Sequence, residues 1–166
     1  MIKAVLSYLI ATTCVAHNIL DFGAIEAKET HHAEITNSMA IVDAIMAAHS
    51  PDNDDRLVHI PQGLWSSFPI RADNVKNITI QIDGVLLLSK DFKNFPNRAP
   101  GEMDHLVEDF LSFHDCEDLK FQGSGEIDGQ GFMWWMREYL QKNPYGRPNI
   151  LGATRVRNLE WTGILV

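Results

Sequence analysis

Three segments of the chain share one pattern, in which apolar and polar residues alternate and a glycine follows. Each segment begins with a small polar residue, which is Asn77, Asp118 or Asn158. The segments are residues 77–84, 118–123 and 158–163. Alternation with a period of two predicts β-strands. Repetition of one strand-and-turn unit predicts a solenoid of stacked strands, so the fold is expected to be all-β.

The spacing of the units leaves two arrangements open. The units begin near Val75, Cys116 and Val156, and they lie about 40 residues apart. This distance fits either two turns of a short-coil solenoid or one turn with added loops.

The first polar residue of each unit is expected to have a structural role. In a parallel stack, Asn77, Asp118 and Asn158 would lie above one another at the strand spacing of about 4.8 Å. Their side chains could then form a ladder, and Asn tolerates the left-handed backbone that such corners need. Asn77-Ile-Thr79 is also a glycosylation sequon. A laddered Asn is not free to carry a glycan, and the ladder is favoured here.

A helix is expected before the strands. Asn37 is a suitable N-cap, and the apolar residues after it recur at helical spacing up to about His49, where Ser50-Pro51 ends the pattern. These apolar residues are Ile41, Ala44, Ile45 and Ala48. A lone amphipathic helix at this place would cover the open end of a solenoid.

Other segments give simpler predictions. A short strand is expected over 18–25, and a loop over 26–36, which includes His31-His32. Strands are expected at Leu57–Ile60 and 85–88, and a short helix from Phe132 to about Lys142.

The N-terminus resembles a secretory signal. A short basic start precedes an apolar run up to Ala16, and small residues stand where a signal peptidase cuts, before His17. Residues 1–16 are therefore predicted to be a signal peptide, with a buried first strand or helix as the alternative. Residues 17–166 are predicted to form part of one domain of a secreted protein. Cleavage would leave Cys116 alone, and its place before a strand favours a buried thiol.

Composition and charge restrict the class of partner. Of the 166 residues, 45% are hydrophobic and 22% are charged, which is typical of a globular domain. A net charge of -8 argues against nucleic-acid binding, which needs a basic face, and against binding to anionic membranes.

The glycine-rich stretch 123–131 does not fit a dinucleotide fingerprint. After Gly123 and Gly125 the third glycine of that fingerprint would fall at Asp128, and no helix follows the turn directly. Glycines at tight solenoid corners explain the stretch better.

Five segments of the chain together carry a family resemblance. The most specific is Gly125-Glu-Ile-Asp128-Gly129-Gln-Gly131, followed by Trp134-Trp135. The others are 18–24, 37–45, 60–65 and 147–151. Taken in order, these segments resemble the N-terminal part of glycoside hydrolase family 28, the polygalacturonases and their relatives. The resemblance implies a right-handed parallel β-helix of the pectin lyase type with an N-terminal capping helix. It also implies a secreted hydrolase that acts on pectin-type polysaccharide in the cell wall, works without a cofactor and is a monomer at full length.

The family's catalytic motifs are an Asn-Thr-Asp motif, an Asp-Asp pair, a Gly-His-Gly and an Arg-Ile-Lys. The chain has one Asp-Asp pair, Asp54-Asp55, in the polar turn 51–55 that is interpreted as a solvated loop, and it has none of the other three motifs. The catalytic motifs are expected beyond Val166. The resemblance implies inverting hydrolysis by two carboxyl groups. Asp83 and Asp128 belong to Ile-Asp-Gly turns and are interpreted as surface turn residues. No catalytic, substrate-binding or metal residue is assigned, and the 166-residue chain alone is expected to be inactive and poorly stable.

Trp134 and Trp135 have two possible roles. They could stack on sugar rings, but adjacent aromatics in a short helix more often pack over a sheet. Two other functional classes also stay open for the chain. One is a non-catalytic carbohydrate-binding β-helix, and the other is a structural or adhesive surface β-helix.

Overall fold

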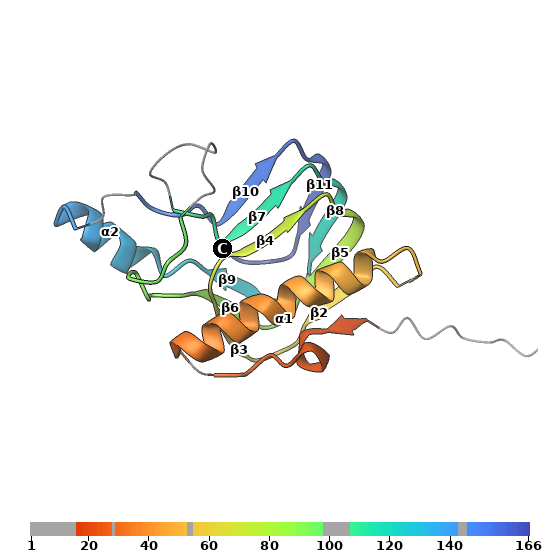
Figure 1. Cartoon of the computed structure of the whole chain (residues 1–166), viewed down its shortest axis with the longest axis horizontal. Helices are drawn as coiled ribbons and strands as arrows, with labels where there is room; N and C mark the ends of the chain where they lie inside the picture. Colours follow the sequence, from red (N-terminus) through yellow and green to blue (C-terminus); the bar gives the residue numbers. More distant parts are fainter. Residues whose placement is uncertain (1–15, 28, 53–54, 98–106, 143–145) are drawn as a thin grey trace, which may run out of the picture.

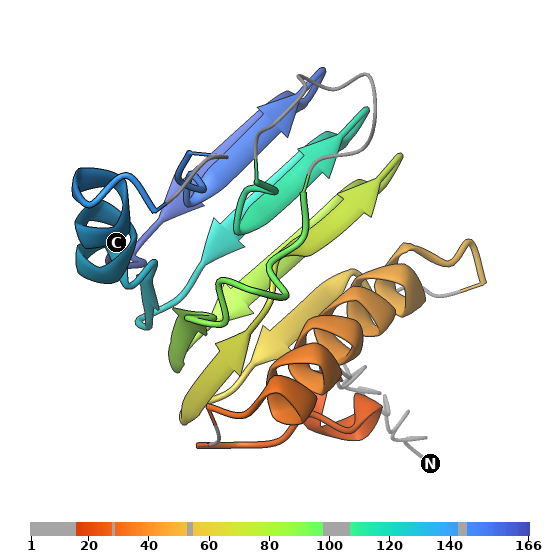
Figure 2. The same cartoon turned by 60° about the vertical axis from the view of Figure 1, so that its left-hand side comes forward.

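The computed structural model describes residues 16–27, 29–52, 55–97, 107–142 and 146–166. Short parallel strands wind in stacked coils, and a long helix lies across one end of the stack (Figure 1). Figure 2 shows successive coils lying side by side, in sequence order away from that helix. The predicted parallel β-helix with an N-terminal capping helix is confirmed.

Three sheets form the walls of the β-helix, and every strand pair within them is parallel. The first, called sheet A, contains β1 (His17–Asn18), β2 (Leu57–Ile60), β5 (Lys76–Ile82), β8 (Glu117–Gln122) and β11 (Arg157–Thr162). Sheet B contains β3 (Leu64–Ser67), β6 (Val85–Leu88) and β9 (Glu126–Asp128). Sheet C contains β4 (Ile70–Asp73), β7 (Leu111–His114) and β10 (Leu151–Thr154).

Each coil passes through sheets A, B and C in turn. The coil β2–β3–β4 turns directly from sheet B to sheet C, whereas the next two coils insert a long segment at that corner. One insertion includes residues 89–97, and the other contains α2 (Gly131–Tyr139). Equivalent residues of the last coils, such as Asp118 and Asn158, are therefore 40 positions apart. Of the two arrangements predicted, the structure has one turn with added loops.

The core consists of inward-facing side chains that stack from coil to coil. Ile80 of β5 lies between Val58 of β2 and Phe121 of β8, and each of these residues is buried. Trp161 of β11 stacks on Phe121 with ring centroids 5.1 Å apart. Burial of a large apolar side chain contributes about 1.5–3 kcal/mol, so these stacked rows stabilise each coil against its neighbour.

The corner between sheets C and A needs left-handed backbone. Asn77, Asp118 and Asn158 have φ angles of 54°, 55° and 56°. Asn and Asp tolerate this region because their short polar side chains bond locally. A second left-handed residue precedes each of them by three positions in the chain, namely Asn74, Asp115 and Arg155.

The corner between sheets A and B needs glycine. Gly123 has φ 137°, and a Cβ added there would lie 1.9 Å from the carbonyl oxygen of Ile82 in the coil before. The strand-following glycines of the sequence pattern therefore allow the backbones of successive coils to approach closely.

The capping helix is longer than predicted. It is α1 (His31–His49), and the Thr30 Oγ1 accepts a hydrogen bond from the Ala33 backbone N–H at 3.3 Å. The predicted cap at Asn37 is thus wrong, and the loop predicted over 26–36 is wrong from His31 onward. The first two turns present Ala33, Glu34 and Asn37 to the core, and a search for large apolar residues alone misses this partly polar buried face.

Asn37 and Glu34 attach α1 to the coils. Asn37 is fully buried, and its side chain bonds the backbone of Ile25 (2.6 and 3.0 Å) and the carbonyl of Ser66 (2.8 Å). Glu34 is 4% exposed and accepts from the hydroxyls of Ser66 (2.9 Å) and Ser89 (2.7 Å). These bonds satisfy polar groups that would otherwise be costly to bury.

The start of the described chain also differs from the prediction. Only His17–Asn18 are a strand, and a short 3-10 helix, η1 (Ile19–Phe22), replaces the rest of the strand expected over 18–25. The predicted signal peptide, apart from Ala16, lies outside the described residues. Within the described part of the chain, no helix is long and apolar enough to cross a membrane.

Candidate functional site

The three polar residues singled out in the sequence meet at one corner of the β-helix. The registers of β5, β8 and β11 place Asn77, Asp118 and Asn158 in a row. The Asn158 Nδ2 donates to the Asp118 Oδ1 at 2.7 Å. Asp118 and Asn158 thus bond along the stack, and all three residues are exposed at this corner.

The glycine-rich signature forms the corner before sheet B and the approach to α2. A Cβ on Gly125 would lie 2.2 Å from the carbonyl oxygen of Gly84 in the preceding coil. Asp128 ends β9, and its Oδ1 accepts from the Gln130 N–H at 2.7 Å. The helix α2 then begins at Gly131, near the expected start of the short helix.

The two adjacent tryptophans have different environments. Trp134 is 3% exposed, and its ring lies edge-on to Phe92 and Phe95 with centroids 4.8 and 4.7 Å apart. Trp135 is 51% exposed and stacks on Tyr139. The first tryptophan therefore packs α2 against the neighbouring insertion, and the second faces outward.

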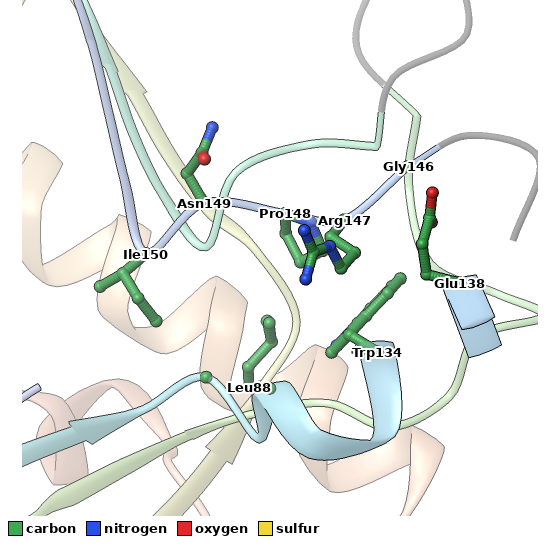
Figure 3. Close-up of a pocket in the computed structure, with 10 residues that line it drawn as sticks. Leu88, Trp134, Glu138, Gly146, Arg147, Pro148, Asn149 and Ile150 are labelled. Carbon is green, nitrogen blue, oxygen red and sulfur yellow. The ribbon is translucent and has the colours of Figure 1, made fainter. Parts of the chain in front are cut away.

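A cavity of about 450 Å³ lies beside α2 and brings two of the sequence motifs together. Gly129, Gly131 and Trp134 come from the glycine-tryptophan signature, and Arg147 and Asn149 come from the segment that leads into β10. In Figure 3, Arg147 and Pro148 lie across the cavity from Leu88 and Trp134. Glu138, Gly146 and Ile150 complete the lining. The cavity is the candidate functional site because a mixed apolar and polar lining of this size is typical of ligand pockets.

A buried carboxylate fixes one wall of the cavity. Asp109 is 5% exposed, and its Oδ1 accepts from the backbone N–H of Asn149 (3.0 Å) and from its Nδ2 (2.8 Å). A Cβ on Gly152 would lie 2.1 Å from the Asp109 Oδ2, so only glycine leaves room for this side chain. Asp109 thereby holds the segment that carries Arg147.

A second polar cluster lies on the outer surface of sheet A. The Asp83 Oδ2 accepts from the Gln81 Nε2 at 2.7 Å and lies 3.1 Å from the His59 Nε2. The Asp83 Oδ1 lies 3.3 Å from the backbone N of Ser124. The hydrogen bond from Gln81 lowers the pKa of Asp83 most, and the bonds from Ser124 and His59 lower it further.

Asp83 and Asp128 do not form a pair. Asp83 lies at the corner after β5, where it contacts Ser124, whereas Asp128 lies opposite Leu87 near the end of sheet B. Each carboxylate accepts hydrogen bonds from its own turn. Among the described residues, no group of three or more His, Cys, Asp or Glu side chains could hold a metal ion.

Cys116 is a buried thiol, as the sequence suggested. It is 2% exposed, and its Sγ lies 3.1 Å from the carbonyl oxygen of His114. Burial raises the pKa of this thiol. A protonated, buried thiol is a poor nucleophile, so Cys116 is a core residue.

The sequence analysis missed several residues of the site. Asp109, Glu138 and Leu88 carry no motif, and they meet the signature only because two insertions leave the β-helix at one corner. The spacing between the repeated units could have indicated where the insertions lie, because each insertion follows a strand of sheet B.

Comparison with known proteins finds partial matches to two polygalacturonases. No protein-family model matches the chain. A probable polygalacturonase of Vitis vinifera is 27% identical over 158 residues, which cover 85% of this chain and 30% of that protein. The chain is similar to this probable polygalacturonase over most of its own length.

A solved structure supports the β-helix fold of the chain. The hyperthermoactive exopolygalacturonase of Thermotoga maritima superposes with a TM-score of 0.63 at 21% identity. The match covers 89% of this chain and 40% of that structure. The fold is the right-handed parallel β-helix, and the chain spans less than half of the length of either protein.

Proposed function

We propose that the chain forms the N-terminal coils of a secreted glycoside hydrolase of the polygalacturonase type, which acts on pectin-type polysaccharide. The observation that carries this proposal is the match to the Vitis vinifera protein over 85% of the chain. The cavity adds support, because the glycine-tryptophan signature and the Arg147 segment converge there.

We further propose that the catalytic carboxylates belong to coils outside this chain. Inverting hydrolysis needs two carboxyl groups about 6.5–9.5 Å apart, with room for a water molecule between them. Among the described residues, Asp83 and Asp128 each accept a hydrogen bond within their own turn, and Asp109 accepts one from Asn149. The 166 residues would then provide the capping helix, the first coils and a substrate-facing wall, without turnover of their own.

The proposal predicts a stereochemical outcome for the native protein. Native protein recovered from its source is incubated with oligogalacturonates, and proton NMR follows the anomer that forms first. Hydrolysis with inversion of the anomeric centre is expected. Retention of configuration, or no cleavage beyond that of a heat-inactivated sample, would contradict the assignment.

A non-catalytic binding module is the second candidate function. The exposed aromatic face of α2 favours it, because such a surface can bind sugar rings without catalysis. Binding of polygalacturonate by the native protein without release of reducing ends would establish this second function.

A further inference from the structure

The exposed aromatic side chains of the described residues gather on one helix. Phe132, Trp135 and Tyr139 are 71%, 51% and 71% exposed, and they lie at helical spacing on one side of α2. Without a partner at this place, all three side chains leave apolar surface in contact with water. A contiguous exposed apolar patch of this kind often marks a binding surface.

Trp135 and Tyr139 stack on each other. Their ring centroids are 5.7 Å apart, and the interplanar angle is 14°. The helix beneath them is anchored, because Trp134 is buried and lies edge-on to Phe92 and Phe95. The exposed face of a ring held in this way suits the C–H face of a pyranose ring, which is apolar and nearly planar, and it loses little conformational entropy on binding.

The charge around α2 is opposite to that of the whole chain. Residues 131–150 contain three basic residues and one acidic residue, whereas the chain carries a net charge of -8. Arg137 lies over the Phe92 ring at 4.3 Å and donates to the Lys142 carbonyl at 3.0 Å. Arg147 is exposed and lines the cavity that Trp134 and Glu138 border from the neighbouring face of α2. A local positive field in an acidic protein steers an anionic ligand to this place.

We infer that α2 and the cavity beside it bind an acidic polysaccharide strand. Trp135 and Tyr139 contact the faces of its sugar rings, and Arg147 pairs with a sugar carboxylate. The inference rests on the proposed function, and it names the residues of this chain that contact the substrate. It predicts that binding depends on both the aromatic rings and the positive charge.

Affinity electrophoresis of the native, full-length protein in gels that contain polygalacturonate tests the site. The variant Trp135→Ala is expected to raise the dissociation constant about tenfold, in line with the energy of one aromatic contact. Trp135→Phe keeps a ring and is expected to stay within about twofold of the wild type. The control Met39→Ala removes a side chain of α1 that is 60% exposed and should leave binding unchanged.

The charge component is tested in the same gels. Arg147→Gln is expected to weaken binding about fivefold and to make it less sensitive to salt. Lys76→Gln, an exposed basic residue of sheet A, serves as its control and should have no effect. Dextran, a neutral polysaccharide, should bind more weakly than polygalacturonate.

Unchanged binding in the Trp135→Ala and Tyr139→Ala variants, with native circular dichroism, would overturn the inference. Equal retention by dextran would overturn it as well. A reducing-end assay on the same samples separates the two proposals. If the native protein cleaves polygalacturonate and the variants bind it as tightly as the wild type, the α2 site is wrong and the hydrolase assignment stands. If the native protein neither binds nor cleaves polygalacturonate, the proposed function itself fails.

Discussion

Gly125 and Gly131 belong to the same signature, but their surroundings differ. A Cβ on Gly125 would meet the Gly84 carbonyl oxygen at 2.2 Å, whereas a Cβ on Gly131 would meet nothing within 4 Å. Gly125→Ala should therefore destabilise the protein by about 1–3 kcal/mol, because two stacked backbones must separate. Gly131→Ala should be neutral or slightly stabilising in the first turn of α2.

Urea unfolding of these two variants measures the difference. Equal midpoints for Gly125→Ala and the wild type would mean that the corner is looser than the structure shows. The pair is well matched because the residues are six positions apart in one segment and differ strongly in the space around Cα.

Asp83 gives a prediction about pH. Its pKa is lowered in the folded protein, chiefly by the Gln81 hydrogen bond. A lowered pKa means that the carboxylate stabilises the fold above its unfolded value of about 3.9 and that this contribution is lost as the pH falls through the folded pKa. Asp83→Asn should thus cost up to about 1 kcal/mol at pH 7 and much less near pH 3. A cost that does not change with pH, measured by chemical unfolding, would contradict this cause.

At the scale of elements, α1 depends on a buried amide. Asn37 bonds the Ile25 backbone and the Ser66 carbonyl, and each of these groups would stay buried without a partner in Asn37→Ala. A loss of about 2–3 kcal/mol is expected, since several buried polar groups are left unsatisfied. Met39→Ala on the exposed face of the same helix should change stability by less than about 0.5 kcal/mol.

Thermal unfolding of these two α1 variants provides the measurement. Similar small losses in both would show that α1 covers the coils through its apolar side chains alone. Hydrogen exchange at Ile25 should rise in Asn37→Ala, because that amide loses its acceptor.

The sequence predicts most of the strands because their alternation is regular. Ile78, Ile80 and Ile82 face inward and their neighbours face outward, so the pattern reports burial directly. The start of α1 is harder to predict, because Ala33, Glu34 and Asn37 occupy the buried face there. A helix with polar residues at core positions is missed when the prediction relies only on the spacing of large apolar residues.

The cavity could be predicted only in part. Its glycine-tryptophan wall and its Arg147 wall are both visible in the sequence as motifs. Their meeting is not visible, because it depends on two insertions that leave the same corner of successive coils. Contacts such as Asp109 with Asn149 join residues 40 positions apart, and no local pattern encodes them.

At the scale of the whole molecule, the stack is covered at one end by α1 and exposes apolar side chains at the other. Leu159, Leu165 and Val166 are 38%, 66% and 73% exposed in the last coil. Exposed strand edges with apolar residues promote association between chains. Purified residues 17–166 are therefore expected to melt broadly and to self-associate, and Leu159→Lys should reduce the association.

Light scattering combined with calorimetry checks this expectation. A sharp unfolding transition in a sample that stays monomeric would contradict it. A concentration-dependent transition that Leu159→Lys makes less dependent on concentration would support it.

The central claim is that these coils belong to a polygalacturonase-type hydrolase whose catalytic residues lie elsewhere. The most direct test is the release of reducing ends from polygalacturonate by the native protein, assayed beside purified residues 17–166 at equal concentration. The account predicts turnover by the native protein and none by the 17–166 chain. Turnover by the 17–166 chain above a heat-inactivated control, or none by the native protein, would contradict it.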